Sequence, residues 1–418
     1  MDFTADNLVY AAGAGLRNSF RLHITMTEPV IGEALEKALN KAARIFPYFA
    51  AKLERNGEEY RLADDHLPLI VMNGSRALTL GSAENNYHLT AAAFEDNSIY
   101  LDFSHYITDG QGSFPFLQTL MYCYLSLIHQ DEKFDTEHMA APENDAGAND
   151  PYPEKPLSFD TFGGSKRPDK IFTLNDQPQG YDHMNEWTSF CLSVRQKDIV
   201  NYISSVDGSP SSFFASLIYR AIDDLHPENE LPIVCGMQHT FRKLLGTTFS
   251  HRCHVNILPI VYPKRLRGRD VERLNTITRG SVILASDDAN DALTVNRHIL
   301  NRERLKKMTL PQKHEYMHKE VLDGIGKNTF EVSYTGRVPW CGLDKYIVGV
   351  SPYLDMTLSG GISAEIFSVG GSFSVTFMQR NSDKAYTERI SGLLKEQNIP
   401  HTMGEPRSFE ISPLSLPE

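Results

Sequence analysis

The architecture of this chain can be argued outward from FSHYITDG, residues 103–110, because an apolar alternating run ends at this stretch and an apolar helical run begins just after it. Upstream, residues 88–103 predict two strands joined by the turn EDNS. Downstream, GSFPFLQTLMYCYLSLIHQ is apolar nearly all round, which predicts a buried helix with Ser113 as its N-cap. The octapeptide therefore occupies a strand-to-helix turn, where side chains and backbone N–H groups are exposed at the edge of a rigid scaffold.

The same pattern of strands and helices extends over the rest of the chain. SFRLHIT at residues 19–25 alternates as a strand does, and residues 31–55 carry apolar side chains at helical spacing up to a break at Pro47. Residues 131–167 are rich in Pro, Gly, Asp and Asn, which indicates a crossover between domains. Because 418 residues exceed one ordinary core and the second half repeats the pattern, we expect an α/β protein with two mixed-sheet domains, residues 1–165 and 166–418.

Composition excludes several classes of function. The net charge of −12 and the absence of basic runs argue against a nucleic-acid partner. No apolar stretch is long enough for a membrane span, and the N-terminus lacks the basic start and apolar core of a signal peptide. The five cysteines are scattered without a CxxC pair, so we expect free thiols in a reducing cytoplasm.

Metal chemistry is not expected. His251, Cys253 and His254 in HRCH are too tightly spaced at a strand start to ligate one zinc ion without a distant fourth group. A structural role for these side chains is favoured, and we predict no metal site.

Two interpretations of the opening motif compete when it is taken alone. A match to His, three residues, Asp and Gly arises readily by chance in a chain with 15 histidines, and Asp109-Gly110 is a common turn pair. In that interpretation His105 is a packed polar residue. The other histidines considered lack comparable sequence context: His88, His129, His239 and His401.

Context favours the second interpretation, because the HxxxDG at residues 105–110 stands between a strand and a buried helix. The motif, together with the strand before it and the buried helix after it, resembles the chloramphenicol-acetyltransferase-like superfamily. That superfamily includes alcohol acyltransferases and the condensation domains of peptide synthetases. FPYF at 46–49 is similar to the helix end that follows the first strand in those proteins. FEVSYTGRV at 330–338 resembles their VSNxG stretch, and MQHTFRKL at 237–244 resembles a strand end that carries an arginine. The resemblance implies two similar domains with an active-site tunnel between them.

The chain also departs from two branches of that superfamily. Condensation domains carry two adjacent histidines, whereas Ser104 precedes His105 here. The plant branch carries a late DFGWG, and SVGGSFSVTF stands in the comparable region of this chain. A less specialised acyltransferase is therefore expected.

The resemblance implies a role for each residue of the motif. His105 Nε2 is expected to accept the proton of an alcohol or amine as it attacks a thioester, since an imidazole with a pKa of about 6.5 is mostly neutral at pH 7. Asp109 is expected to point away and hold the turn by pairing with an arginine, and Gly110 to permit a backbone geometry that a Cβ would forbid. The arginine candidates are Arg17, Arg21 and Arg242.

The oxyanion of the tetrahedral intermediate needs a fixed donor. Strand alternation places Ser333 and Thr335 on one face and Tyr334 on the other. Thr335 is the first candidate donor and Ser333 the second. The competing interpretation of YTGR is a β-turn with solvent-facing hydroxyls.

The expected function is therefore a cytoplasmic acyltransferase that uses coenzyme A thioester as co-substrate, without a tightly bound cofactor. A small-molecule acyl donor and an alcohol or amine acceptor are the expected partners. Two alternatives remain: a stand-alone condensation-like enzyme that takes its acyl group from an acyl carrier protein, and a non-catalytic homologue that binds a thioester or a partner in the same cleft.

Overall fold

Side chains and secondary structure are described for most of the chain in a computed structural model. The description covers residues 5–12, 16–135, 146–159, 167–174, 187–248, 250–336, 340–356, 359–380 and 383–418.

The first sheet has five strands in the order β11-β1-β6-β5-β4. Their bounds are β11 (Ile347–Leu354), β1 (Ser19–Met26), β6 (Ser98–Ser104), β5 (Thr90–Glu95) and β4 (Val71–Asn73). β4 runs parallel to β5 and the other pairs are antiparallel, so the sheet is mixed. β5 and β6 are the two strands predicted before the motif, and His105 follows β6 directly.

The second sheet has eight strands, with the main path β14-β7-β13-β12-β10-β8-β9 and β15 paired to β7. Their bounds are β14 (His401–Met403), β7 (Thr188–Arg195), β13 (Ser372–Gln379), β12 (Ile362–Val369), β10 (Phe330–Tyr334), β8 (Ile233–Thr240), β9 (Val255–Tyr262) and β15 (Arg407–Ser408). β10 is parallel to both of its neighbours, which makes this sheet mixed as well. Strand β12 is buried along its whole length, as a strand packed on both faces should be.

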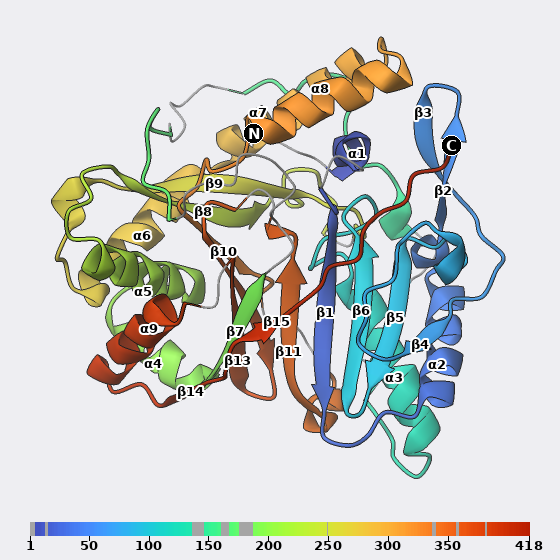
Figure 1. The fold of residues 1–418 in the computed structure, drawn as a ribbon, viewed down its shortest axis with the longest axis horizontal. Helices are drawn as coiled ribbons and strands as arrows, with labels where there is room; N and C mark the ends of the chain where they lie inside the picture. The colour runs from blue at the N-terminus through green and yellow to red at the C-terminus, as the bar shows by residue number, and fades with distance from the viewer. Residues whose placement is uncertain are drawn as a thin grey trace.

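The two sheets lie next to each other in the middle of the molecule, and helices cover their outer sides (Figure 1). α2 (Gly32–Ile45) packs against α3 (Phe114–Ile128) beside the first sheet, and Leu35, Ala38, Leu39 and Ala42 form its buried face. α4 (Gln196–Ser205), α5 (Pro210–Leu225), α6 (Val271–Ala285) and α9 (Ala385–Glu396) lie beside the second sheet. The remaining elements are α1 (Ala5–Leu8), α7 (Asp288–Leu305), α8 (Leu310–Leu322) and the hairpin β2 (Lys52–Asn56) and β3 (Glu59–Ala63).

Segments from the second half of the sequence complete the first sheet and its core. β11 belongs to the second half but pairs with β1, and the C-terminal segment crosses the molecule so that Leu414 pairs with Leu80. The first core contains Leu343 and Phe367 for the same reason. The predicted α/β class with two mixed sheets is confirmed. The division at residue 165 stays a prediction and lies outside the described residues. Within the described residues, the helices are too short or too polar to cross a bilayer.

Candidate active site

A cavity of about 250 Å³ lies between the two sheets and includes the predicted motif in its wall. Its volume is near the lower end of ligand pockets, which begin at about 300 Å³. β1 and β11 supply apolar side chains, among them Phe20, Leu22 and Leu354. Polar side chains come from β8, β10 and β12 of the other sheet. The strands β1 and β11 thus give the cavity much of its apolar surface, and β8, β10 and β12 give it hydroxyl, imidazole and carboxyl groups.

His105 lines this cavity immediately after the end of β6, and its backbone N–H donates to the carbonyl of Asn18 at 2.9 Å. Its Nδ1 lies 3.2 Å from the carbonyl oxygen of Thr108. A carbonyl only accepts, so Nδ1 carries the hydrogen and Nε2 keeps its lone pair. The ring also packs on Phe20, with centroids 4.9 Å apart.

The electrostatic surroundings keep His105 neutral. Burial lowers the pKa of this imidazole below its usual value, because the charged form loses its hydration. The bond to the Thr108 carbonyl and the carboxylates of Asp109 and Asp355 oppose that shift without reversing it. At pH 7 the ring therefore holds its one proton on Nδ1 and offers Nε2 as a base.

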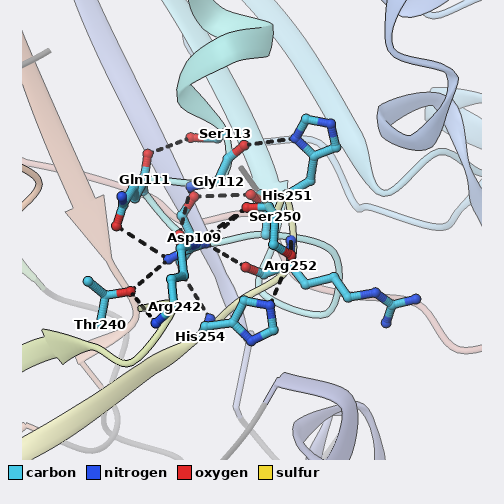
Figure 2. Close-up of polar contacts among 12 residues, drawn as sticks. Asp109, Gln111, Gly112, Ser113, Thr240, Arg242, Ser250, His251, Arg252 and His254 are labelled. Atoms are coloured by element: carbon cyan, nitrogen blue, oxygen red, sulfur yellow. Dashed lines mark hydrogen bonds and ion pairs between the residues drawn. The ribbon is translucent and has the colours of Figure 1, made fainter. Parts of the chain in front are cut away.

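Asp109 does not orient the His105 imidazole, whose Nδ1 is bound to the Thr108 carbonyl. It holds the turn through the contacts drawn in Figure 2. Its Oδ1 accepts from Arg242 Nη2 at 2.8 Å and from the Gly112 N–H at 2.7 Å, and its Oδ2 accepts from the His254 N–H at 2.9 Å. Burial alone would raise the pKa of Asp109, but the Arg242 guanidinium and the two amides hold it below its usual value. The carboxylate thus ties the turn to residues of the opposite lobe.

Arg242 is the arginine that the structure pairs with Asp109, and both side chains are almost fully buried. Its remaining N–H groups bind carbonyl and side-chain oxygens of Thr240, Gln111, Ser250 and Arg252 (Figure 2). The other two candidates are bound elsewhere. Arg21 forms a two-pronged pair with Asp102 on the adjacent strand, and Arg17 donates its Nη1 hydrogen to the Ile411 carbonyl.

The HRCH segment contacts the turn of the motif from the other lobe. The backbone of His254 binds Asp109, and the ring of His251 packs among Phe46, Tyr48 and Phe49. Within the described ranges, no three His, Cys, Asp or Glu side chains converge as a metal site.

Gly110 and Gly112 serve close packing. Gly110 does not adopt a positive φ, contrary to the backbone geometry expected for it, and a Cβ there would lie 3.0 Å from Thr335 Cγ2. A Cβ on Gly112 would lie 2.2 Å from the carbonyl oxygen of His251. The turn therefore needs a missing side chain at Gly112 more strictly than at Gly110, a requirement that the sequence analysis did not identify.

Thr335 and Ser333 both line the cavity, on the second sheet. Thr335 abuts the turn of the motif at Gly110, and its hydroxyl makes one long bond, 3.4 Å, to the Ile366 carbonyl. Ser333 hydrogen-bonds the carboxyl of Glu365 on the neighbouring strand. Ser333 is thus occupied by that carboxyl, and Thr335 lies nearer to the motif.

Sequence reasoning missed four cavity residues. Asn18 is 3% exposed, and its Nδ2 has no hydrogen-bond partner among the described residues. His239 was set aside because its sequence context carries no motif, and the structure places it in the cavity wall with Nε2 at 3.1 Å from Asp291. Glu331 and Glu365 face the cavity with Ser333 and Thr335. The signal for Glu331 was present, because alternation along β10 places residues 331, 333 and 335 on one face.

Comparison with known proteins adds evidence about the fold. No known family profile matches the chain, and no curated protein matches its sequence. Solved structures do match. TRI101 of F. sporotrichioides, crystallised with coenzyme A and T-2, is similar over 96% of this chain and 99% of its own, at 12% identity and a TM-score of 0.60.

Two further solved structures match at nearly full length. Polyketide synthase associated protein 5 from Mycobacterium tuberculosis is 12% identical, with 93% of this chain and 96% of that chain covered and a TM-score of 0.59. The condensation domain of the Monacolin K polyketide synthase MokA is 11% identical, with 94% of each chain covered and a TM-score of 0.53. At this identity the likeness shows the fold and leaves the activity to be argued from the site.

Proposed function

We propose that this chain, which has the chloramphenicol-acetyltransferase-like fold indicated by its motif, transfers an acyl group from coenzyme A thioester to an alcohol or amine. The observation that carries the proposal is the neutral His105 in the cavity wall, with Nδ1 hydrogen-bonded to Thr108 and Nε2 left as a base. Coenzyme A is proposed as donor because the similar TRI101 structure holds it. The cytoplasmic location stays a prediction.

The proposed reaction is direct transfer. The acceptor hydroxyl or amine attacks the thioester carbonyl while His105 Nε2 takes its proton, and a tetrahedral intermediate forms. The C–S bond then breaks and the proton passes from Nε2 to the sulfur. The products are an ester or amide and free coenzyme A thiol, so no bond to the enzyme is needed.

The oxyanion of that intermediate needs donors in place before reaction. We assign this role first to the Thr335 hydroxyl, which lies against the motif's turn. The side-chain amide of Asn18 is a second donor candidate, because its buried Nδ2 has no partner among the described residues and Asn18 also holds the His105 backbone. Ser333 is less suitable, since it binds Glu365.

The decisive experiment compares two histidines of the same cavity. His105→Ala is expected to lower acyl transfer by roughly 10² or more, measured as thiol released from acyl-CoA in the presence of pooled alcohols and amines. His239→Gln serves as the matched control and should keep most of the activity. If His239→Gln is inactive and His105→Ala is active, the assignment of the base is overturned.

A carrier-protein donor is the second candidate, favoured by the likeness to a condensation domain. Supplying the same acyl group on coenzyme A and on a phosphopantetheinyl carrier protein separates the two donors. If the acyl group is transferred from the carrier protein but not from coenzyme A, the carrier protein becomes the proposed donor. Binding of coenzyme A without turnover of any thioester would favour the non-catalytic alternative.

A further inference from the structure

Two carboxyl side chains lie on neighbouring strands in the wall of the cavity, offset diagonally by two residues. Glu331 is on β10 and Glu365 on the adjacent strand β12, where Glu365 pairs in register with Ser333. Because residues two apart on a strand share a face, both carboxyls lie on the face that carries Thr335. They belong to the same cavity as His105 but have no part in the proposed transfer step.

Glu365 has unused hydrogen-bonding capacity. The residue is 4% exposed, and its Oε1 has no hydrogen-bond partner in the described part of the chain. A buried polar atom left without a partner costs about 1–3 kcal/mol, so such atoms in a cavity wall point to a ligand that completes the bond. Glu331 is better satisfied, since its Oε1 accepts from Asn328 Nδ2 at 3.0 Å.

The ionisable groups around the cavity suit a cationic ligand. Glu331, Glu365, Asp109 and Asp355 contribute to its wall, whereas no described lining residue is Lys or Arg. Asp109 is neutralised by its ion pair with Arg242. Glu331 and Glu365 are diagonal neighbours on adjacent strands, because Glu331 pairs with Ser363 and Glu365 pairs with Ser333. Carboxyl groups in such a wall can ionise against a positively charged ligand group and form charge-assisted hydrogen bonds with it.

We propose that Glu331 and Glu365 bind a protonated amino group of the acceptor, at a distance from the atom that is acylated; this rests on the proposed acyltransferase function. Register gives the spacing. Glu365 pairs with Ser333, which precedes Thr335 by two residues, and Glu331 precedes Thr335 by four. The backbone positions of the two glutamates therefore lie about 7 and about 13 Å along the strand from Thr335. The acceptor class is therefore an amino alcohol or a diamine with several bonds between its two functional groups.

Protonation of the pair supports the assignment. Burial raises the pKa of Glu365 to about 8; the Ser333 hydrogen bond opposes this and the Glu331 charge adds to it. Thr376, its register neighbour on β13, carries no charge. Burial also raises the pKa of Glu331, although the Asn328 bond and the Arg167 charge act in the opposite direction. An arriving ammonium therefore displaces a proton from this pair.

The test compares two acceptors that differ by one amino group, 6-amino-1-hexanol and 1-hexanol. With acetyl-CoA as donor, kcat/KM is expected to be roughly 10- to 100-fold higher for the amino alcohol, the range of a charge-assisted hydrogen bond. Calorimetric binding of the same two compounds to the full chain measures the preference without turnover. Repeating the titration in buffers of different ionisation enthalpy should show proton release with the amino alcohol alone.

Glu365→Gln keeps the shape of the neutral acid and cannot ionise, so it should abolish the preference and the proton release while transfer to 1-hexanol persists. Glu331→Gln should weaken the preference, and Glu36→Gln, at an exposed site on α2, is the matched control. Equal binding and transfer of the two alcohols, or a preference that survives both cavity variants, would overturn the inference. Transfer to both alcohols without preference leaves the proposed function standing, whereas preferential binding without any transfer refutes the proposed function and supports the site.

Discussion

Replacing Asp109 by Asn separates the two roles that an aspartate in this motif could have. The substitution keeps the shape of the side chain and removes its charge, which leaves the Arg242 guanidinium uncompensated. The side chains of Arg242 and Asp109 are 2% and 4% exposed, so solvent does not screen the loss. Breaking a buried pair in this way costs about 3–5 kcal/mol of unfolding free energy. The double variant Asp109→Asn/Arg242→Met should regain about 2–3 kcal/mol, because it carries no unpaired buried charge.

Activity of the same variant should change much less than stability. The tautomer of His105 is fixed by the Thr108 carbonyl, so Asp109→Asn is expected to lower kcat by roughly tenfold or less at temperatures where the variant is folded. Equilibrium urea unfolding and thiol-release kinetics give the two readouts. A folded variant with a loss of 10³ or more would refute the structural role. A double variant less stable than Asp109→Asn would refute the charge argument.

Three further predictions follow from the same geometry. Because burial lowers the pKa of His105, the acid limb of kcat/KM against pH should lie below the usual pKa of about 6.5; a limb at pH 7 or above would contradict this. Gly110→Ala should lower activity by displacing Thr335 with little loss of stability, whereas Gly112→Ala should lower the thermal midpoint most; equal effects on both measurements would contradict the contact geometry. Glu365 has a raised folded pKa, so its stabilisation is complete below the unfolded pKa of about 4.5 and is lost as pH rises through about 8. The unfolding free energy of wild type relative to Glu365→Gln should therefore fall by at most about 1.4 kcal/mol per pH unit in that window. Parallel profiles of unfolding free energy against pH for the two proteins would exclude a raised pKa of Glu365 in the folded state.

The local pattern around the motif was readable from the sequence because it depends on neighbours in the chain. Alternation predicted β5 and β6, and an apolar helical run after Ser113 predicted α3, which begins at Phe114. Ser113 occupies the N-cap position but donates its hydroxyl to the Gly110 carbonyl, so it closes the turn and does not cap the helix N–H groups. The local pattern thus predicted the N-cap position correctly, but it did not predict the hydrogen bond that the Ser113 hydroxyl makes there.

Non-local pairing was harder to predict. Three arginines were candidates for Asp109, and the one that pairs with it stands 133 residues away on the other lobe. The capture of Arg21 by Asp102 depends on the register between β1 and β6, which no single-strand pattern reveals. His239 was missed for the same reason, since its place in the cavity depends on β8 lying beside β10.

The charge states inside the cavity form one consistent set. A base with a lowered pKa stays unprotonated at neutral pH, but ionised carboxylates nearby would raise that pKa again, as Asp109 and Asp355 do in part for His105. Burial keeps Glu365 protonated below about pH 8, so in the absence of ligand it adds little negative charge to the cavity. An acceptor that brings an ammonium supplies the counter-charge at the moment the carboxyl ionises. The acidic wall and the neutral imidazole can therefore share one small cavity without either perturbing the charge that the other needs.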